Sequence, residues 1–125
     1  MIKFYFPLLL LLSSLISKSQ ICQWAVGFNG SAEQRTWAIK TDNLGNIFTT
    51  GYFNGVADFD PSSGSYTLTS RSFQDYDCFV SKLDKNGNFV WAKDFGGAWY
   101  TYGYSIGLDG SGNVYVAGFF TDTAD

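Results

Sequence analysis

The chain reads Asp42-Asn43-Leu44-Gly45-Asn46 and, 67 residues later, Asp109-Gly110-Ser111-Gly112-Asn113. The same spacing relates Gly51-Tyr52-Phe53 to Gly118-Phe119-Phe120, and Trp24-Ala25 to Trp91-Ala92. Of the 35 aligned pairs between Trp24/Trp91 and Asp58/Asp125, 12 are identical, with no insertion or deletion. Self-similarity at a fixed period is typical of repeat architectures, in which one unit buries its apolar face only against its neighbours. The sequence therefore says more about architecture than about a binding partner.

Turns of the form Asp-x-x-Gly-Asn divide the repeat into strands. Their fixed positions are Asp42, Gly45, Asn46, Asp84, Gly87, Asn88, Asp109, Gly112 and Asn113. Asp and Asn bond to their own main chain and Gly takes a positive φ without a Cβ clash, so each turn between β-rich runs predicts a hairpin. The predicted strands are 37–42, 46–53, 77–84 and 88–95 in the first copy, and 104–109 and 113–120 in the second.

The second strand of each copy carries apolar side chains on both faces, as in Val114-Tyr115-Val116-Ala117. Such a strand needs a sheet packed on each side. In the long connection 54–76, Pro61 ends any pairing, while 66–69 alternates like a strand at an edge. Four-stranded antiparallel units in tandem predict an all-β fold of β-propeller blades. One complete blade is expected at 37–95, followed at 96–125 by a linker and the first half of a second, truncated blade.

Three stretches resemble the SBBP-type β-propeller repeats of secreted bacterial proteins, which are common in Bacteroidetes. They are Leu83 to Lys93, Gly112 to Phe120, and Ala57-Asp58-Phe59-Asp60-Pro61. The resemblance implies a protein of several blades, often with a C-terminal secretion-sorting domain. Within 20–36, the stretch Trp24 to Phe28 matches the fourth strand of a blade. In a full protein this strand could complete the last blade and close the ring.

The first 19 residues have the layout of a secretory signal peptide. Lys3 precedes an apolar core from Phe4 to Ile16, and Ser17 and Ser19 precede a cleavage site before Gln20. A membrane anchor is the alternative, but the core is shorter than the roughly 20 residues that span a bilayer. We therefore expect a secreted or cell-surface protein that is not inserted in the membrane after cleavage. The remaining chain has 6 basic and 11 acidic side chains, which argues against nucleic acid or an anionic membrane as partner.

The two cysteines, Cys22 and Cys78, allow several states in an exported protein. An intramolecular disulfide, intermolecular pairing and simple burial are all open, and the spacing matches no metal motif.

Catalysis has few candidate residues in this chain. The chain has no histidine, which excludes Ser-His-Asp and Cys-His mechanisms. The carboxylates Asp58 and Asp60 could serve glycoside hydrolysis or bind calcium through oxygen. Turn formation is the simpler interpretation of both, and we expect no cofactor, with calcium as the alternative.

Aromatic residues are the candidates for ligand binding. Most lie at repeat-equivalent strand positions, where packing between blades explains them. Trp99, Tyr100 and Tyr102 differ, because their counterparts in 32–35 are not aromatic. An aromatic cluster on a connection could stack on a sugar or a peptide. We therefore expect a non-catalytic module for binding or scaffolding at the cell surface, whose partners are a protein or a glycan and the remaining propeller blades. The alternative is a fragment of a propeller-type glycosidase or lyase whose catalytic residues lie in other blades.

Overall fold

The computed structural model describes residues 22–72, 74–97 and 99–121, so the proposed signal peptide and Asp122 to Asp125 lie outside the described residues. The described residues form strands and turns without a helix. The strands are β1 (Asn29–Gly30), β2 (Gln34–Thr41), β3 (Ile47–Phe53), β4 (Val56–Asp58), β5 (Thr67–Thr69), β6 (Asp77–Leu83), β7 (Phe89–Phe95), β8 (Thr101–Leu108) and β9 (Val114–Phe120). In the described part of the chain, no helix is long and apolar enough to cross a membrane.

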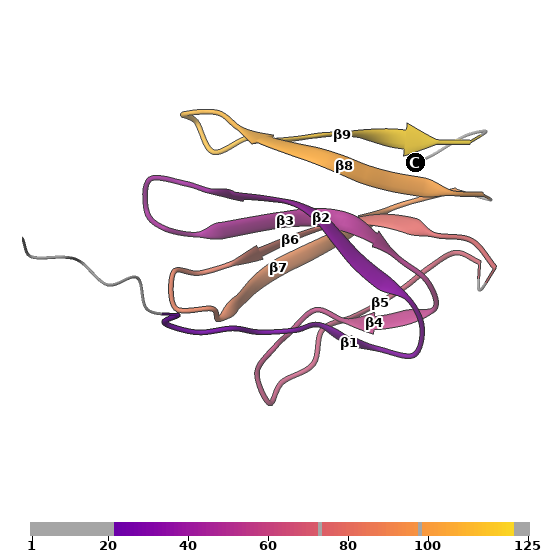
Figure 1. Ribbon diagram of the computed structural model, residues 1–125, viewed down its shortest axis with the longest axis horizontal. Coiled ribbons are helices and arrows are strands. Elements are labelled where there is room, and N and C mark those ends of the chain that lie inside the picture. Colours follow the sequence, from indigo (N-terminus) through magenta and orange to yellow (C-terminus); the bar gives the residue numbers. More distant parts are fainter. Residues whose placement is uncertain (1–21, 73, 98, 122–125) are drawn as a thin grey trace, which may run out of the picture.

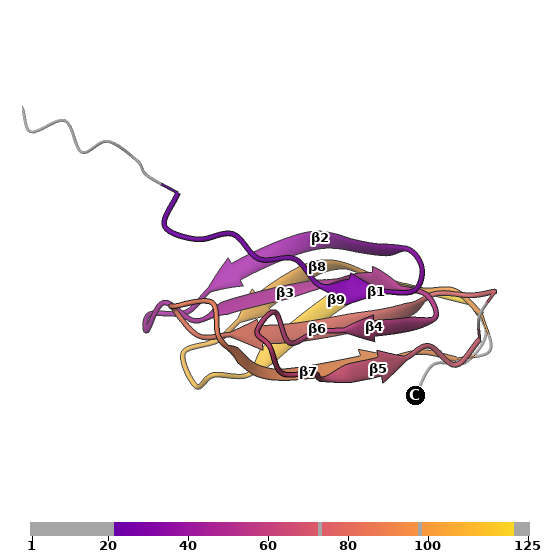
Figure 2. The same ribbon diagram turned by 90° about the horizontal axis from the view of Figure 1, so that it is seen from below.

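The strands form three stacked antiparallel layers (Figure 1). The middle layer is a four-stranded sheet in the order β2-β3-β6-β7. The hairpin β8–β9 lies on one face of this sheet, and the small sheet β1-β4-β5 lies on the other. Figure 2 shows β4 and β5 lying over β6 and β7 on that second face. The prediction of one complete antiparallel blade and half of a second is confirmed.

The three Asp-x-x-Gly-Asn turns have the same geometry. In the first, Asp42 Oδ1 accepts hydrogen bonds from the backbone N–H groups of Leu44 and Asn46, each at 2.9 Å. Asp84 and Asp109 accept the equivalent bonds in their own turns. The glycine has φ of 82° at Gly45 and 86° at Gly87 and Gly112, where a side chain would strain the backbone. The prediction of left-handed glycines in hairpin turns is confirmed.

Two apolar cores separate the layers. Towards β4 and β5, the core consists of Phe53, Ala57, Phe59, Phe79 and Ala92, with Phe28, Leu68 and Phe89 at its edge. Towards β8, it consists of Phe48, Val80 and Ile106, with Ala38, Trp91, Leu108 and Val114 around them. From Phe48 to Phe53 every residue of β3 is buried, so β3 is the strand covered on both faces that the sequence predicts.

The structure differs from the predicted elements at the starts of both copies. Strand β2 begins at Gln34 instead of Trp37, because Gln34 to Thr36 pair with Phe53 to Gly51 before a bulge at Trp37. Strand β8 begins at Thr101 instead of Tyr104, with the equivalent bulge at Tyr104. The bulge interrupts the period-two pattern, which hides the first residues of each strand from sequence analysis.

The stretch from Trp24 to Phe28 is not a strand in this structure, which corrects the expectation of an N-terminal strand. It runs along the middle sheet without pairing: the indole nitrogen of Trp24 donates to the carbonyl oxygen of Lys85 at 3.3 Å, and the Phe28 ring contacts Phe59 and Phe79. The connection 54–76 folds into a hairpin of its own, β4–β5, so 66–69 does form an edge strand, of the small sheet.

Candidate binding site: an aromatic cluster around Glu33

Six aromatic side chains from both copies gather where β2 and β3 meet β8. We call this set the aromatic cluster: Trp37, Tyr52, Tyr76, Tyr100, Tyr102 and Tyr104. Three of these rings form a row: Tyr102 and Tyr104 belong to β8, and Tyr100 directly precedes that strand. Neighbouring rings of the row lie 6.0 Å apart and nearly parallel, with interplanar angles of 7° and 12°.

The first copy supplies the other side of the aromatic cluster. Tyr52 of β3 packs edge-on against Tyr102 at 4.9 Å and against Tyr76 at 4.8 Å. Trp37, at the bulge of β2, lies 4.8 Å from Tyr104, at the bulge of β8. Tyr52 is buried, whereas Trp37, Tyr100 and Tyr104 remain exposed. The aromatic cluster therefore has a buried base and an open face.

Glu33 is the charged centre of the aromatic cluster. Its carboxylate accepts hydrogen bonds from the hydroxyls of Tyr52 at 3.0 Å and Tyr76 at 2.9 Å. Arg35 forms an ion pair with Glu33 at 3.0 Å, and its guanidinium lies 5.9 Å from the centre of the Tyr52 ring. Carboxylate oxygens have more lone-pair sites than these bonds use, so an exposed Glu33 can still accept a bond from a ligand.

The hydrogen bonds fix the protonation states of this site. The Tyr76 hydroxyl, followed by that of Tyr52, lowers the pKa of Glu33. Burial and then the bond to Glu33 raise the pKa of Tyr52, and for Tyr76 the bond to Glu33 is the larger cause. Burial also raises the pKa of Tyr102. At neutral pH the site therefore presents one ionised acceptor among protonated phenols.

Sequence reasoning found only part of this site. Tyr100 and Tyr102 lie in it as predicted, but Trp99 is exposed and its ring contacts no ring of another described residue. Glu33, Arg35, Tyr52 and Tyr76 were missed. The signal was present in the repeat: Glu33, Arg35 and Trp37 are the counterparts of Tyr100, Tyr102 and Tyr104. Because successive blades stack face to face, repeat-equivalent positions on β2 and β8 lie side by side.

The other predicted site residues lie elsewhere. Asp58 Oδ1 accepts bonds from the backbone N–H groups of Tyr66 at 2.8 Å and Asp60 at 3.0 Å, and the former is the main reason that the pKa of Asp58 is lowered. Asp60 accepts a bond from the N–H of Ser62 at 2.9 Å. Both carboxylates thus shape the β4–β5 loop. Among the described residues, no group of three or more acidic, Cys or His side chains is placed to hold a metal ion.

Of the alternatives left open for Cys22 and Cys78, the structure does not show the intramolecular disulfide. Both are free thiols: Cys22 is exposed ahead of Trp24, and Cys78 is buried on β6 beside the Thr50 hydroxyl at 3.6 Å. Burial raises the pKa of the Cys78 thiol, which keeps it protonated and unreactive.

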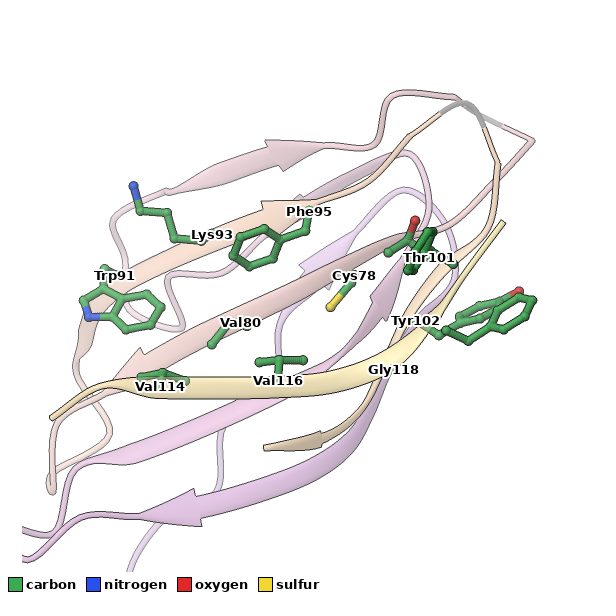
Figure 3. A pocket seen from close by; sticks show the side chains of 12 residues that line it. Cys78, Val80, Trp91, Lys93, Phe95, Thr101, Tyr102, Val114, Val116 and Gly118 are labelled. Atoms are coloured by element: carbon green, nitrogen blue, oxygen red, sulfur yellow. The ribbon is translucent and has the colours of Figure 1, made fainter. Parts of the chain in front are cut away.

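A second feature is an apolar groove of about 460 Å³ between β9 and the strands β6 and β7 (Figure 3). Val114, Val116 and Gly118 on β9 face Val80 of β6 and Trp91 and Phe95 of β7. Lys93 and Cys78 also line it.

Comparisons with known proteins agree with the topology. Residues 90–118, which cover β8 and most of β7 and β9, match the family model described as a beta-propeller repeat (SBBP). The chain is also 30% identical over 98 residues to an uncharacterised WD repeat-containing protein, L264, of Acanthamoeba polyphaga mimivirus. That alignment covers 78% of this chain but only 7% of the relative. No solved structure matches significantly. Sheet order, stacked copies and the matched repeat together show an all-β architecture of β-propeller blades, with one complete blade and half of a second.

Proposed function

We propose that this chain acts as a non-catalytic binding module of an exported β-propeller protein, and that the aromatic cluster contacts a glycan. The observation that carries the proposal is the row of parallel tyrosine rings beside the ionised Glu33. Flat aromatic rings offer apolar faces to sugar rings, and a carboxylate accepts hydrogen bonds from sugar hydroxyls. Binding sites typically combine such an apolar surface with a few well-placed polar groups.

The protonation states favour binding over proton transfer. A general acid at neutral pH needs a raised pKa, whereas hydrogen bonds lower the pKa of Glu33. The raised pKa values of Tyr52 and Tyr76 keep both phenols protonated, so neither is a base. The rival function is that of a propeller-type glycosidase or lyase whose catalytic residues lie in other blades. The aromatic cluster does not support this alternative.

A glycan array followed by calorimetry on the best ligand tests this proposal. Tyr104→Ala is expected to weaken binding about two- to tenfold, since an aromatic contact contributes about 0.5–1.5 kcal/mol. Glu33→Gln is expected to weaken it more, because a hydrogen bond to a charged group contributes about 1.5–3 kcal/mol. Tyr115→Ala is the matched control, since Tyr115 is an exposed tyrosine of β9 outside the aromatic cluster.

The array can also reject the proposal. Equal binding by Tyr104→Ala and Tyr115→Ala would remove the aromatic cluster from the contact. A protein ligand that depends on Tyr104, with no glycan bound, would assign the aromatic cluster to protein recognition instead, where exposed aromatic anchors also dominate.

Export is part of the same proposal and has its own test. Lys3, the apolar core and Ser17 and Ser19 form the expected signal layout, so a secreting host should release a protein that begins at Gln20. Mass spectrometry of the exported protein reads the new N-terminus. An exported protein that retains Met1 would contradict cleavage, whereas a start two to four residues away would only move the boundary.

A further inference from the structure

The apolar groove between the two copies has a counterpart elsewhere in the molecule. Its β9 wall includes Val114, Val116, Gly118 and Phe120, which share one face of that strand. At the repeat spacing of 67 residues, this face corresponds to Ile47, Thr49, Gly51 and Phe53 of β3. The opposite wall includes Trp91 and Phe95, which correspond to Trp24 and Phe28. The equivalent space therefore lies below β3, between the middle sheet and the N-terminal segment.

In the first copy that space is filled. The hairpin β4–β5 lies across it, and the Phe59 ring is inserted between Phe28 at 4.9 Å, Phe53 at 5.5 Å and Phe79 at 4.9 Å. Phe59 and Ala57 are completely buried there. The corresponding rings in the groove, Phe95 and Phe120, are both exposed and line its walls.

The sequence after β9 begins to repeat the same hairpin. Ala124 and Asp125 are the counterparts of Ala57 and Asp58, the two residues that precede Phe59. Both lie outside the described residues, so the link rests on sequence alone. In the first copy Phe53 ends β3 and Val56 starts β4 a few residues later, so a hairpin that follows Phe120 at the same spacing would reach the groove.

We propose that the groove is a binding site for an aromatic β-hairpin of the same sequence type as 57–69, whose phenylalanine inserts between Phe95 and Phe120. The apolar walls suit the ring, and Lys93 is the charged residue of the lining. An acidic hairpin suits that lysine. The hairpin needs no cation to fold, because its carboxylates Asp58 and Asp60 already accept hydrogen bonds from backbone N–H groups of their own loop. Binding of a hairpin in the groove does not depend on glycan binding at the aromatic cluster.

The test extends the full chain after Asp125 with a copy of the sequence from Phe59 to Ser70. A thiol introduced by Val116→Cys reports on the groove, and alkylation at that site is followed by mass spectrometry. The extension is expected to slow alkylation at least about tenfold, the protection that burial of one phenylalanine side chain supports. The same extension with alanine in place of its phenylalanine should lose most of that protection.

A matched reporter and two outcomes decide the matter. Val90→Cys places the thiol at a similarly exposed valine of β7 that does not line the groove, and its alkylation should not change. An unchanged rate at position 116, or equal slowing by the phenylalanine and alanine extensions, would overturn the proposal. Protection that appears without any extension and rises with protein concentration would also overturn it, by assigning the groove to a second copy of the chain.

Discussion

Phe53 and Phe120 occupy the same position in two copies of one repeat, yet the first is 0% exposed and the second 59%. Ile39 and Ile106 show the opposite order, with 64% and 5% exposed. In both pairs the residue type and the hairpin are the same. The difference arises because β3 has layers on both faces, whereas every residue of β9 after Val114 is exposed. In the second pair, Ile106 packs against the first copy while Ile39 faces solvent. Repeat-equivalent residues contribute to stability only where a neighbouring layer covers them.

The largest expected effect separates the two phenylalanines. Phe53→Ala should lower the free energy of unfolding by about 3–5 kcal/mol, because it leaves a cavity among Phe59, Phe79 and Ala92. Phe120→Ala should cost less than about 1 kcal/mol, since half of its side chain is already in water. Urea denaturation of both variants measures the difference. Equal losses would mean that the described packing around β3 is wrong.

The isoleucine pair tests the interface between the copies. Ile106→Ala should destabilise the protein by about 2–5 kcal/mol, because Ile106 packs with Phe48 and Val80 of the first copy. Ile39→Ala should stay within about 0.5 kcal/mol of the parent protein. Urea denaturation measures the free energy of unfolding of both isoleucine variants. A costly Ile39→Ala would show that another layer covers β2 in solution.

Glycine substitutions test the turns within the second copy. Gly112→Val should cost more than about 1 kcal/mol because a β-branched residue resists the φ of 86°, although its Cβ would meet nothing within 4 Å. Gly107 has no positive φ, and a Cβ there would lie 3.9 Å from Tyr115, an ordinary contact. Gly107→Val is thus expected to be tolerated better. Equal sensitivity at Gly107 and Gly112 would count against the assigned hairpin.

The smallest effect concerns the acid titration of equivalent turns. Asn113 is the main cause that lowers the pKa of Asp109 from 3.8 to about 2, and the Tyr115 hydroxyl adds a further bond at 3.0 Å. Asp42 has a lowered pKa through Asn46, but its neighbour is Phe48, which has no hydroxyl. Because the folded-state pKa is lowered, the stabilisation by Asp109 is present above about pH 4 and is lost as the pH falls towards 2.

Carboxyl NMR titration should therefore find Asp109 titrating below Asp42. Tyr115→Phe should raise the pKa of Asp109 towards that of Asp42, and Asp109→Asn should remove this part of the acid sensitivity. A Tyr115→Phe variant with an unchanged Asp109 titration would show that the hydroxyl does not bond the carboxylate in solution.

The strands, the turns and the fold class could be predicted from the sequence because they depend on local signals. Asp42, Gly45 and Asn46 determine a turn within five residues, and the apolar side chains on both faces of β3 predict a covering layer on each side. The starts of β2 and β8 were missed because a bulge at Trp37 and at Tyr104 breaks the alternation. The state of the two cysteines was left open because cysteine spacing carries no information on distance in space.

The sequence by itself determined that this protein is built from repeated antiparallel hairpins, since turn chemistry and strand period act between near neighbours. Only the tertiary structure decided that Glu33 binds the hydroxyls of Tyr52 and Tyr76, and that Tyr102 packs against Tyr52. It also decided which copy of each repeated residue is buried, as with Phe53 and Phe120. Contacts between distant segments depend on how the layers stack, and stacking is settled by burial of apolar area over the whole molecule.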